Sequence, residues 1–167
     1  MTPAKAGFDV RPFDDRQLLE ELLTHRWVEG SLMVLGKPVY PGEVDALAAY
    51  KDGSLAGVAT WCLRDGLPCL LTLNNITTHP GIGVALVDGM IELMRARDLP
   101  ALRAIVTNDN VDGLRFYQRR GFRIVAVYPG SIDNSRKIKP AIPKTGLHGI
   151  PYRDEIELEM PLEPRPA

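Results

Sequence analysis

Two glycines stand at the start of a predicted helix, and their spacing suits the binding of a phosphate group. The stretch reads ITTHPGIGVAL over residues 76–86, with Gly81 and Gly83 one residue apart. The first N–H groups of a helix have no partner within the helix, and the helix dipole favours negative charge there. Glycine also lets an anionic ligand approach the backbone closely. Three interpretations are open: a plain tight turn, a dinucleotide-binding turn, and a cradle for another pyrophosphate.

The dinucleotide-binding interpretation fits the rest of the chain poorly. The pattern is G-x-G-x-x-L, because Leu86 stands where a third glycine is expected. A Rossmann fold needs repeated β-α-β units, and this sequence predicts one. A P-loop is excluded, since no Gly-Lys-Ser/Thr sequence follows the glycines. A nicotinamide-dependent reductase stays an alternative that stabilisation by NAD(P)H would reveal.

A second set of residues that could do chemistry lies in a short predicted helix over 110–120. Asn110 stands at its start, Tyr117 lies near its end, and Gly121 follows it. Asparagine caps a helix by accepting hydrogen bonds from the first turn, and a phenol can protonate a leaving group. Each residue also has a plainer interpretation, in which Asn110 is only a cap and Tyr117 is a core aromatic.

The histidines and cysteines do not indicate a metal site. Cys62 and Cys69 form no C-x-x-C pair, and His25, His79 and His148 form no H-E-x-x-H pattern. We therefore expect no metal, and we expect two buried thiols that act as small apolar side chains.

The composition is that of an ordinary folded domain. The chain has 167 residues, of which 45% are hydrophobic and 25% charged. A net charge of −1 gives no reason to expect binding to nucleic acid or to an anionic membrane. No apolar run approaches the roughly 20 residues that span a bilayer, and the first ten residues lack the apolar core of a secretory signal. We expect a cytoplasmic protein.

The elements that must position these residues form a mixed α/β pattern. Strands are predicted at 8–13, three times within 44–73, and at 101–107, 122–128 and 155–160, with helices at 14–27, 83–97 and 110–120. The segments 30–43 and 129–153 are predicted as irregular connections. The order gives an antiparallel meander followed by one β-α-β unit over 69–107, which implies a parallel strand pair.

The glycine turn, the later helix and the strand between them resemble the GCN5-related N-acetyltransferase (GNAT) family. That family has the loop Q/R-x-x-G-x-G/A and the signature N-x-x-A-x-x-x-Y-x-x-x-G-F. Here residues 78–83 read THPGIG, and Asn110, Gly113, Tyr117 and Gly121-Phe122 keep the later spacing. The resemblance is most specific over 69–128. It implies one acetyltransferase domain over 1–167, with a GNAT-like mixed antiparallel and parallel sheet flanked by helices.

The resemblance further implies acetyl-CoA as co-substrate. Backbone N–H groups at the glycine turn would bind its pyrophosphate, and the end of the preceding strand would pair with its pantetheine arm. Asn110 would hydrogen-bond that arm, and Tyr117 would protonate the leaving thiolate. The residues expected at acetyl-CoA are Thr72, Leu73, Thr78, His79, Gly81, Ile82, Gly83, Val84, Ala85, Asn110 and Tyr117.

This sequence departs from the family pattern at three places. Thr78 replaces the usual Gln or Arg, and Pro80 has no N–H, so two contacts to phosphate are weakened. The strand before the turn, PCLLTL over 68–73, carries no acid, although many members place a general base there. Carboxylates elsewhere fit surface or turn positions as well as catalysis, and the base stays unassigned: Glu43, Asp45, Asp109 and Asp133.

The acceptor side is less defined than the cofactor side. In this fold the segments 25–43 and 129–153 would wall the acceptor, and the candidate contacts are Trp27, Trp61, Asn74 and Arg136. The basic residues of 135–155 fit either a solvated loop or the binding of an anionic acceptor. The resemblance implies direct acetyl transfer to the amine of a small molecule or peptide. The alternative is a catalytically silent acyl-CoA sensor, and a homodimer is an expected assembly because many relatives are dimers.

Overall fold

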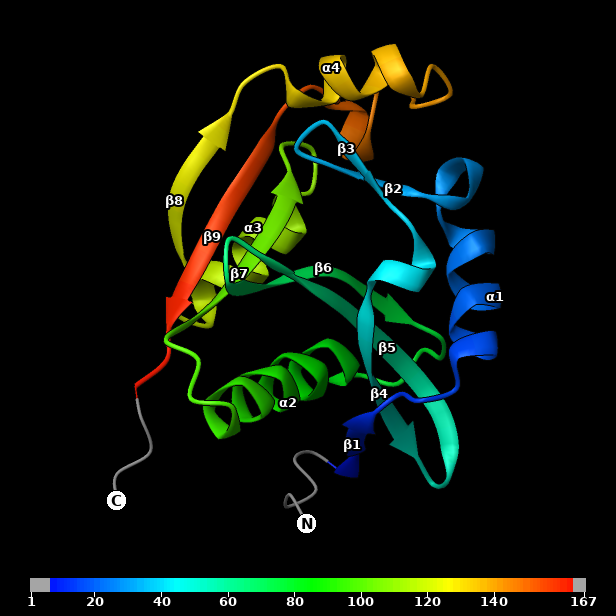
Figure 1. The fold of residues 1–167 in the computed structure, drawn as a ribbon, viewed down its shortest axis with the longest axis vertical. Coiled ribbons are helices and arrows are strands. Elements are labelled where there is room, and N and C mark those ends of the chain that lie inside the picture. Colours follow the sequence, from blue (N-terminus) through cyan, green and yellow to red (C-terminus); the bar gives the residue numbers. More distant parts are fainter. Residues whose placement is uncertain (1–6, 164–167) are drawn as a thin grey trace.

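The computed structural model describes residues 7–163 and contains a seven-stranded sheet with helices on both faces (Figure 1). The strand order is β1-β4-β5-β6-β7-β9-β8. Its strands are β1 (Asp9–Pro12), β4 (Asp45–Lys51), β5 (Ser54–Arg64), β6 (Leu67–Asn75), β7 (Ala101–Thr107), β8 (Arg123–Tyr128) and β9 (Glu155–Pro161). The helices are α1 (Arg16–Arg26), α2 (Ile82–Ala96), α3 (Val111–Arg119) and α4 (Ser131–Ile138). The expectation that the first ten residues are not a secretory signal concerns residues that lie partly outside the described range.

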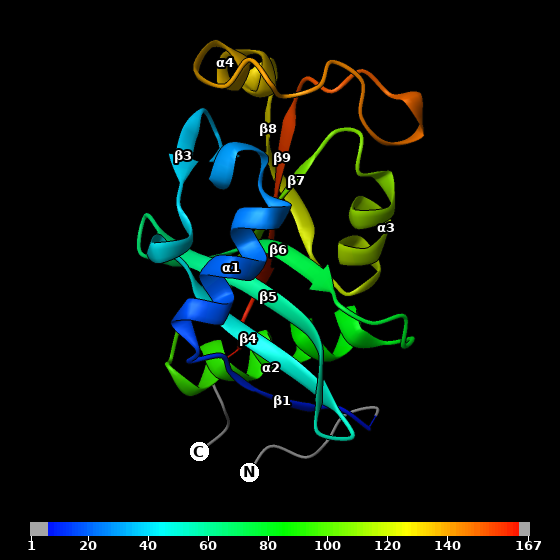
Figure 2. The ribbon, with the colours of Figure 1, turned by 90° about the vertical axis from the view of Figure 1, so that its right-hand side faces the viewer.

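The first half of the sheet, β4 to β6, is covered on both faces. Figure 2 shows α1 in front of β4 and β5, with α2 on the far side. Side chains of a strand alternate between faces. Accordingly Leu47 and Ala49 of β4 join the core under α2, while Ala46 and Ala48 join the core under α1. No helix within 7–163 is both long and apolar enough to cross a bilayer.

The centre of the sheet is an interrupted parallel pair. β6 and β7 run parallel, as predicted, but they pair only at Cys69–Arg103 and Leu70–Ala104. On its other side β6 pairs with β5, where the register shifts so that Leu71 has no partner opposite it. Such a bulge bends and twists a strand. β6 therefore leaves β7 immediately after Leu70, and the two strands splay.

Close packing places the start of α2 beside this splay. Gly81 precedes the helix with φ of +88°, a left-handed conformation that suits glycine. Gly57 of β5 lies under the first helical turn, and a Cβ there would overlap the Ile82 side chain. The helix start can therefore approach the sheet closely, next to the last residues of β6.

The predicted strands and helices are confirmed, with ends that differ by one or two residues. Two predicted connections are wrong. Within 30–43 the chain forms a separate hairpin of β2 (Leu32–Val34) and β3 (Lys37–Val39), between the short 3-10 turns Val28–Gly30 and Pro41–Glu43. Within 129–153 it forms α4 and a third short turn, Leu147–Gly149.

The hairpin and the α4 segment pack together over one end of the sheet, at the top of Figure 1. Met33 of β2 contacts Ile132 of α4 in a small apolar cluster. The buried Lys139 donates to the main-chain oxygens of Val28 and Ser31. The Glu155 carboxylate accepts the N–H of Leu35, at 3.0 and 3.1 Å to its two oxygens. The first two contacts join the hairpin region to the α4 segment, and the third joins the hairpin to β9. We call the hairpin and the α4 segment together the cover.

Candidate active site

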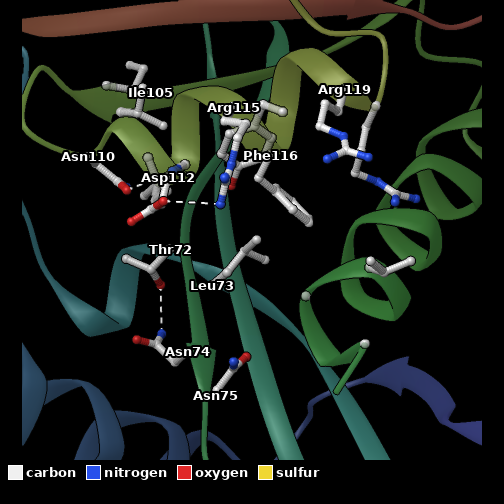
Figure 3. Close-up of a pocket in the computed structure, with 18 residues that line it drawn as sticks. Thr72, Leu73, Asn74, Asn75, Ile105, Asn110, Asp112, Arg115, Phe116 and Arg119 are labelled. Carbon is white, nitrogen blue, oxygen red and sulfur yellow. Dashed lines mark hydrogen bonds and ion pairs between the residues drawn. The ribbon is translucent and has the colours of Figure 1, made fainter. Parts of the chain in front are cut away.

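The splay between β6 and β7 opens a cavity of about 1050 Å³ (Figure 3). We call this cavity the slot. The last residues of β6 form one wall and α3 forms the opposite wall, while the start of α2 closes one end. In Figure 3, Thr72, Leu73 and Asn74 face Asn110 and Phe116 across the space.

The slot is lined from both faces of the sheet. Leu73 and Val106 belong to the core under α2 and α3. Asn74 lies opposite Val58, which belongs to the core under α1, so Asn74 is on the other face. Ile105 alternates with Val106 along β7 and likewise faces away from α3. A ligand in the slot is therefore reachable from both faces of the sheet.

The start of α2 presents its first N–H groups at the slot. Gly81, Gly83 and Val84 line the cavity. The N–H of Ala85 already donates to the Gly81 carbonyl at 2.9 Å, as the first intrahelical bond. The N–H groups before it have no carbonyl one turn earlier to bond. Ile82 and Ala85 bury their side chains in the core, whereas Thr78 and His79 are exposed and lie outside the lining.

Asn110 begins α3 at the far wall of the slot. Its Oδ1 accepts the N–H of Gly113 at 2.9 Å, so the predicted helix cap is confirmed. Gly121 has φ of +93° and ends the helix as predicted. The cap leaves the amide group of Asn110 among the residues that line the slot.

Tyr117 lines the slot from α3 and is 6% exposed. Its ring packs edge-on against Phe116 and Phe122, with centroids 5.2 Å away in both cases. Burial raises the pKa of the phenol above its usual value, with a smaller contribution from the nearby Cys69. The hydroxyl therefore keeps its proton at neutral and moderately alkaline pH and can act as a proton donor.

Three arginines of α3 and its end line the slot, and sequence reasoning missed them. They are Arg115, Arg119 and Arg120. Arg120 pairs with Asp88 of α2, and its guanidinium lies 5.7 Å from the Phe116 ring centroid. Arg115 and Arg119 are one helical turn apart, so the i, i+4 spacing on the helix that carries Tyr117 was the available signal.

The predicted acceptor contacts lie in different places. Asn74 lines the slot and donates to Thr72 Oγ1 at 2.8 Å. Trp61 belongs to the core under α2 and borders a separate cavity of about 400 Å³. Trp27 is buried under α1 and does not line the slot. Arg136 pairs with Asp133 and donates to main-chain oxygens of its own segment.

Sequence comparison identifies the family. The sequence model described as the acetyltransferase (GNAT) family matches residues 17–122. This chain belongs to the GNAT acetyltransferase family. Two proteins of Bacillus subtilis (strain 168) are similar to it. The uncharacterized protein YdhI is 31% identical over 143 residues, 84% of this chain and 89% of that protein. The uncharacterized protein YxbD is 32% identical over 135 residues, 78% of this chain and 84% of that protein.

Solved structures confirm the predicted GNAT fold. The IAA acetyltransferase from Bacillus cereus ATCC 14579 matches with a TM-score of 0.69 and 21% identity, over 93% of this chain and 99% of that one. A GNAT family acetyltransferase from Elizabethkingia anophelis, with acetyl-CoA bound, matches with a TM-score of 0.68 and 18% identity, over 95% and 100%. A Bacillus subtilis acetyltransferase in complex with CoA matches with a TM-score of 0.66 and 18% identity, over 93% and 99%.

Proposed function

We propose that this GNAT protein transfers the acetyl group of acetyl-CoA to the amine of a small molecule or peptide in the cytoplasm, by direct attack in a ternary complex. The observation that carries the proposal is the slot itself. It joins an unpaired strand edge, a helix start and a buried phenol around one space. Those groups match the three parts of acetyl-CoA: the pantetheine arm, the pyrophosphate and the thioester.

The strand edge of β6 suits the pantetheine arm. Beyond Leu70 no strand within 7–163 pairs with the side of β6 that faces β7. The arm contains two amide groups, and an amide chain that adds to a free sheet edge gains main-chain hydrogen bonds. We assign this contact to Thr72 and Leu73, with Asn110 opposite them.

The start of α2 suits the pyrophosphate. The free N–H groups of Ile82, Gly83 and Val84 and the helix dipole favour a negative group there. Arg115 and Arg119, on the facing helix, add positive charge at the wall of the slot. We assign no contact to the exposed His79, although a protonated imidazole there would add to the same field.

Tyr117 is the proposed acid for the leaving thiolate. Its hydroxyl is neutral over the working pH range because burial raises its pKa. A thiolate that leaves beside it can take that proton, which prevents the reverse attack on the new amide.

The proposal is tested by binding and then by turnover. Acetyl-CoA should raise the melting temperature, and NADPH should not. A thiol-reactive dye should then report CoA release when acetyl-CoA is mixed with a panel of primary amines. Stabilisation by acetyl-CoA without thiol release from any amine would favour the silent sensor instead. Stabilisation by NADPH alone would overturn both interpretations.

A further inference from the structure

The acceptor amine needs a proton acceptor, and β6 offers none. An alkylamine is mostly an ammonium ion at neutral pH, and it must lose a proton before it can attack a thioester. The residues of β6 read LPCLLTLNN, with no acid among them. Beyond the splay, the strand that carries several acids is β9, which lies next to β7 in the sheet.

The face of the sheet away from α2 and α3 carries three carboxylates on β9. Ile156, Leu158 and Met160 face the core under α2 and α3. Because strand side chains alternate, the residues between them face the opposite side: Glu155, Glu157 and Glu159. They form one row beside the slot without lining it, and their positions along β9 decide which of them lies next to a residue that does.

The register between β9 and β7 places the middle carboxylate, Glu157, beside a residue that lines the slot. Glu157 lies directly opposite Ile105, which lines the slot, whereas Glu159 lies opposite Arg103, on the closed side of the splay. Residues directly opposite each other in an antiparallel pair have side chains about 5 Å apart on the same face. Glu155 lies opposite Thr107, and its two oxygens already accept the Leu35 N–H under the cover.

Glu157 and Tyr117 are each close enough to Cys69 to interact with it electrostatically. The pKa of the Cys69 thiol is raised to about 12, mainly by burial, and the charge of Glu157 is a smaller contribution in the same direction. Burial also raises the pKa of Tyr117, and Cys69 contributes to that shift. Cys69 is the last residue but one before the splay. The Glu157 carboxylate and the Tyr117 phenol thus belong to different faces of the sheet, and both are near Cys69.

The Glu157 carboxylate is held in place by two partners. Tyr128 of β8 donates to Oε2 at 2.6 Å, and Arg103 of β7 lies 3.3 Å from Oε1. These two partners fix the orientation of the carboxylate, and each of its oxygens has a further lone pair for a donor. The other titratable groups around it are Cys69 on β6, Arg64 at the end of β5, which acts on Cys69 and Tyr128, and Glu155 and Glu159 on the same face of β9.

We propose that Glu157 is the general base that deprotonates the acceptor ammonium, an inference that rests on the proposed acetyl transfer. Glu157 takes one proton from the ammonium, and the nitrogen lone pair forms the C–N bond at the thioester carbon. The C–S bond breaks, and the thiolate takes the Tyr117 proton. The nitrogen gives its remaining extra proton to the Tyr117 phenolate, and Glu157 releases its proton to water. The products are the amide, the CoA thiol and one proton.

The test compares Glu157→Gln with Glu159→Gln, a matched change two residues along the same face and on the same arginine. With alkyl primary amines, Glu157→Gln should lower kcat/KM about 100-fold at neutral pH, and Glu159→Gln should change it less than about 3-fold. The loss should shrink as the pH rises towards the pKa of the amine, because the neutral amine then needs no base. Acetyl-CoA binding should be unchanged in both variants.

A neutral nucleophile separates catalysis from folding. With aniline as acceptor, which is uncharged at neutral pH, the same preparation of Glu157→Gln should keep nearly the wild-type rate of CoA release. Equal loss with alkylamines and with aniline would overturn the assignment, as would wild-type turnover of alkylamines by Glu157→Gln. If the wild-type protein acetylates no amine at all, the proposed function fails and this assignment falls with it.

Discussion

The two halves of the sheet differ in what their faces carry. In β4 to β6 both faces are apolar and covered, one by α1 and the other by α2. In β7, β9 and β8 one face is apolar under α3, while the other carries the carboxylates of β9 and the guanidinium of Arg103. The first half of the sheet therefore provides a packed apolar core on both faces. The second half carries the paired carboxylate and guanidinium groups.

The charged face is stable because its charges are paired. Arg103 bridges Glu157 and Glu159, at 3.3 and 2.8 Å. Tyr128 donates to the other oxygen of Glu157. Removing charge from water is costly unless partners replace the water. The proposed acid, Tyr117, therefore lies on the apolar face of the sheet, and the proposed base, Glu157, lies on the charged face. A variant at each residue tests its role.

The largest effect after loss of the base is expected at the acid on the apolar face. Tyr117→Phe keeps the ring between Phe116 and Phe122 but removes the hydroxyl, so kcat should fall about 100-fold with unchanged acetyl-CoA binding. Steady-state kinetics across pH measure this. Tyr50→Phe, at a ring under Arg11 and away from the slot, is the control. Unchanged turnover at every pH would remove Tyr117 as the acid.

A bulky residue in place of Gly83, at the end of the slot that α2 closes, should weaken acetyl-CoA binding without disrupting the fold. A Cβ on Gly83 would lie 3.7 Å from Phe116 and 4.0 Å from Leu73, which is ordinary contact. Gly83→Leu should therefore fold but fill the slot, and weaken acetyl-CoA binding by about 2 kcal/mol, or roughly 30-fold. Calorimetric titration measures the affinity, with Gly42→Leu as control, since a Cβ on Gly42 meets open space. Full affinity in Gly83→Leu would place the cofactor elsewhere.

Asn110 allows its two roles to be separated. Asn110→Asp keeps the oxygen that caps α3 but loses the amide donor, so it should retain stability and bind acetyl-CoA about 5-fold more weakly. Asn110→Ala should lose the cap as well, at about 1 kcal/mol of stability. Thermal melting and calorimetric titration distinguish the two variants. If Asn110→Ala melts lower but both variants bind acetyl-CoA as tightly as the wild type, Asn110 is a cap and nothing more.

The smallest effect concerns Glu155 under the cover. Burial raises the pKa of this carboxyl, and the Leu35 N–H only partly opposes the shift. A raised pKa means that the native state gains stability from this group at low pH and loses it as the pH rises through that pKa. Glu155→Gln removes the titration. Its melting temperature should improve relative to the wild type by roughly 2 °C between about pH 4 and pH 8. A constant difference would mean that this carboxyl titrates as it does in the unfolded chain.

The glycine turn and α3 were predictable because their signals are local. Gly81 fixes the turn before α2, and Asn110 and Gly121 mark the two ends of α3, so each element could be placed from a few adjacent residues. The parallel pair followed from the order of strands and helix. The slot itself needed the fold, because the Leu71 bulge depends on the pairing between β5 and β6.

The β2–β3 hairpin and α4 were less predictable because they lack those signals. The β2–β3 turn places Leu35 at φ of +48°, where glycine is usual, and Pro38 lies within β3. α4 begins after Gly130 with no side-chain cap and buries little apolar surface. The position of Glu157 opposite Ile105 depends on the register between strands far apart in sequence. A contact between residues so far apart in the chain leaves no recognisable pattern in the sequence.

The short junction between β6 and β7 has a mechanical meaning. Only Cys69–Arg103 and Leu70–Ala104 connect the two halves of the sheet there, whereas β7 and β9 pair along their whole length. The sheet is therefore stiff within each half and compliant along the seam between them. In the proposed complex the pantetheine arm would lie along the free edge of β6 in that seam, in the place of a strand. Acetyl-CoA binding would then also tie the two halves of the sheet together.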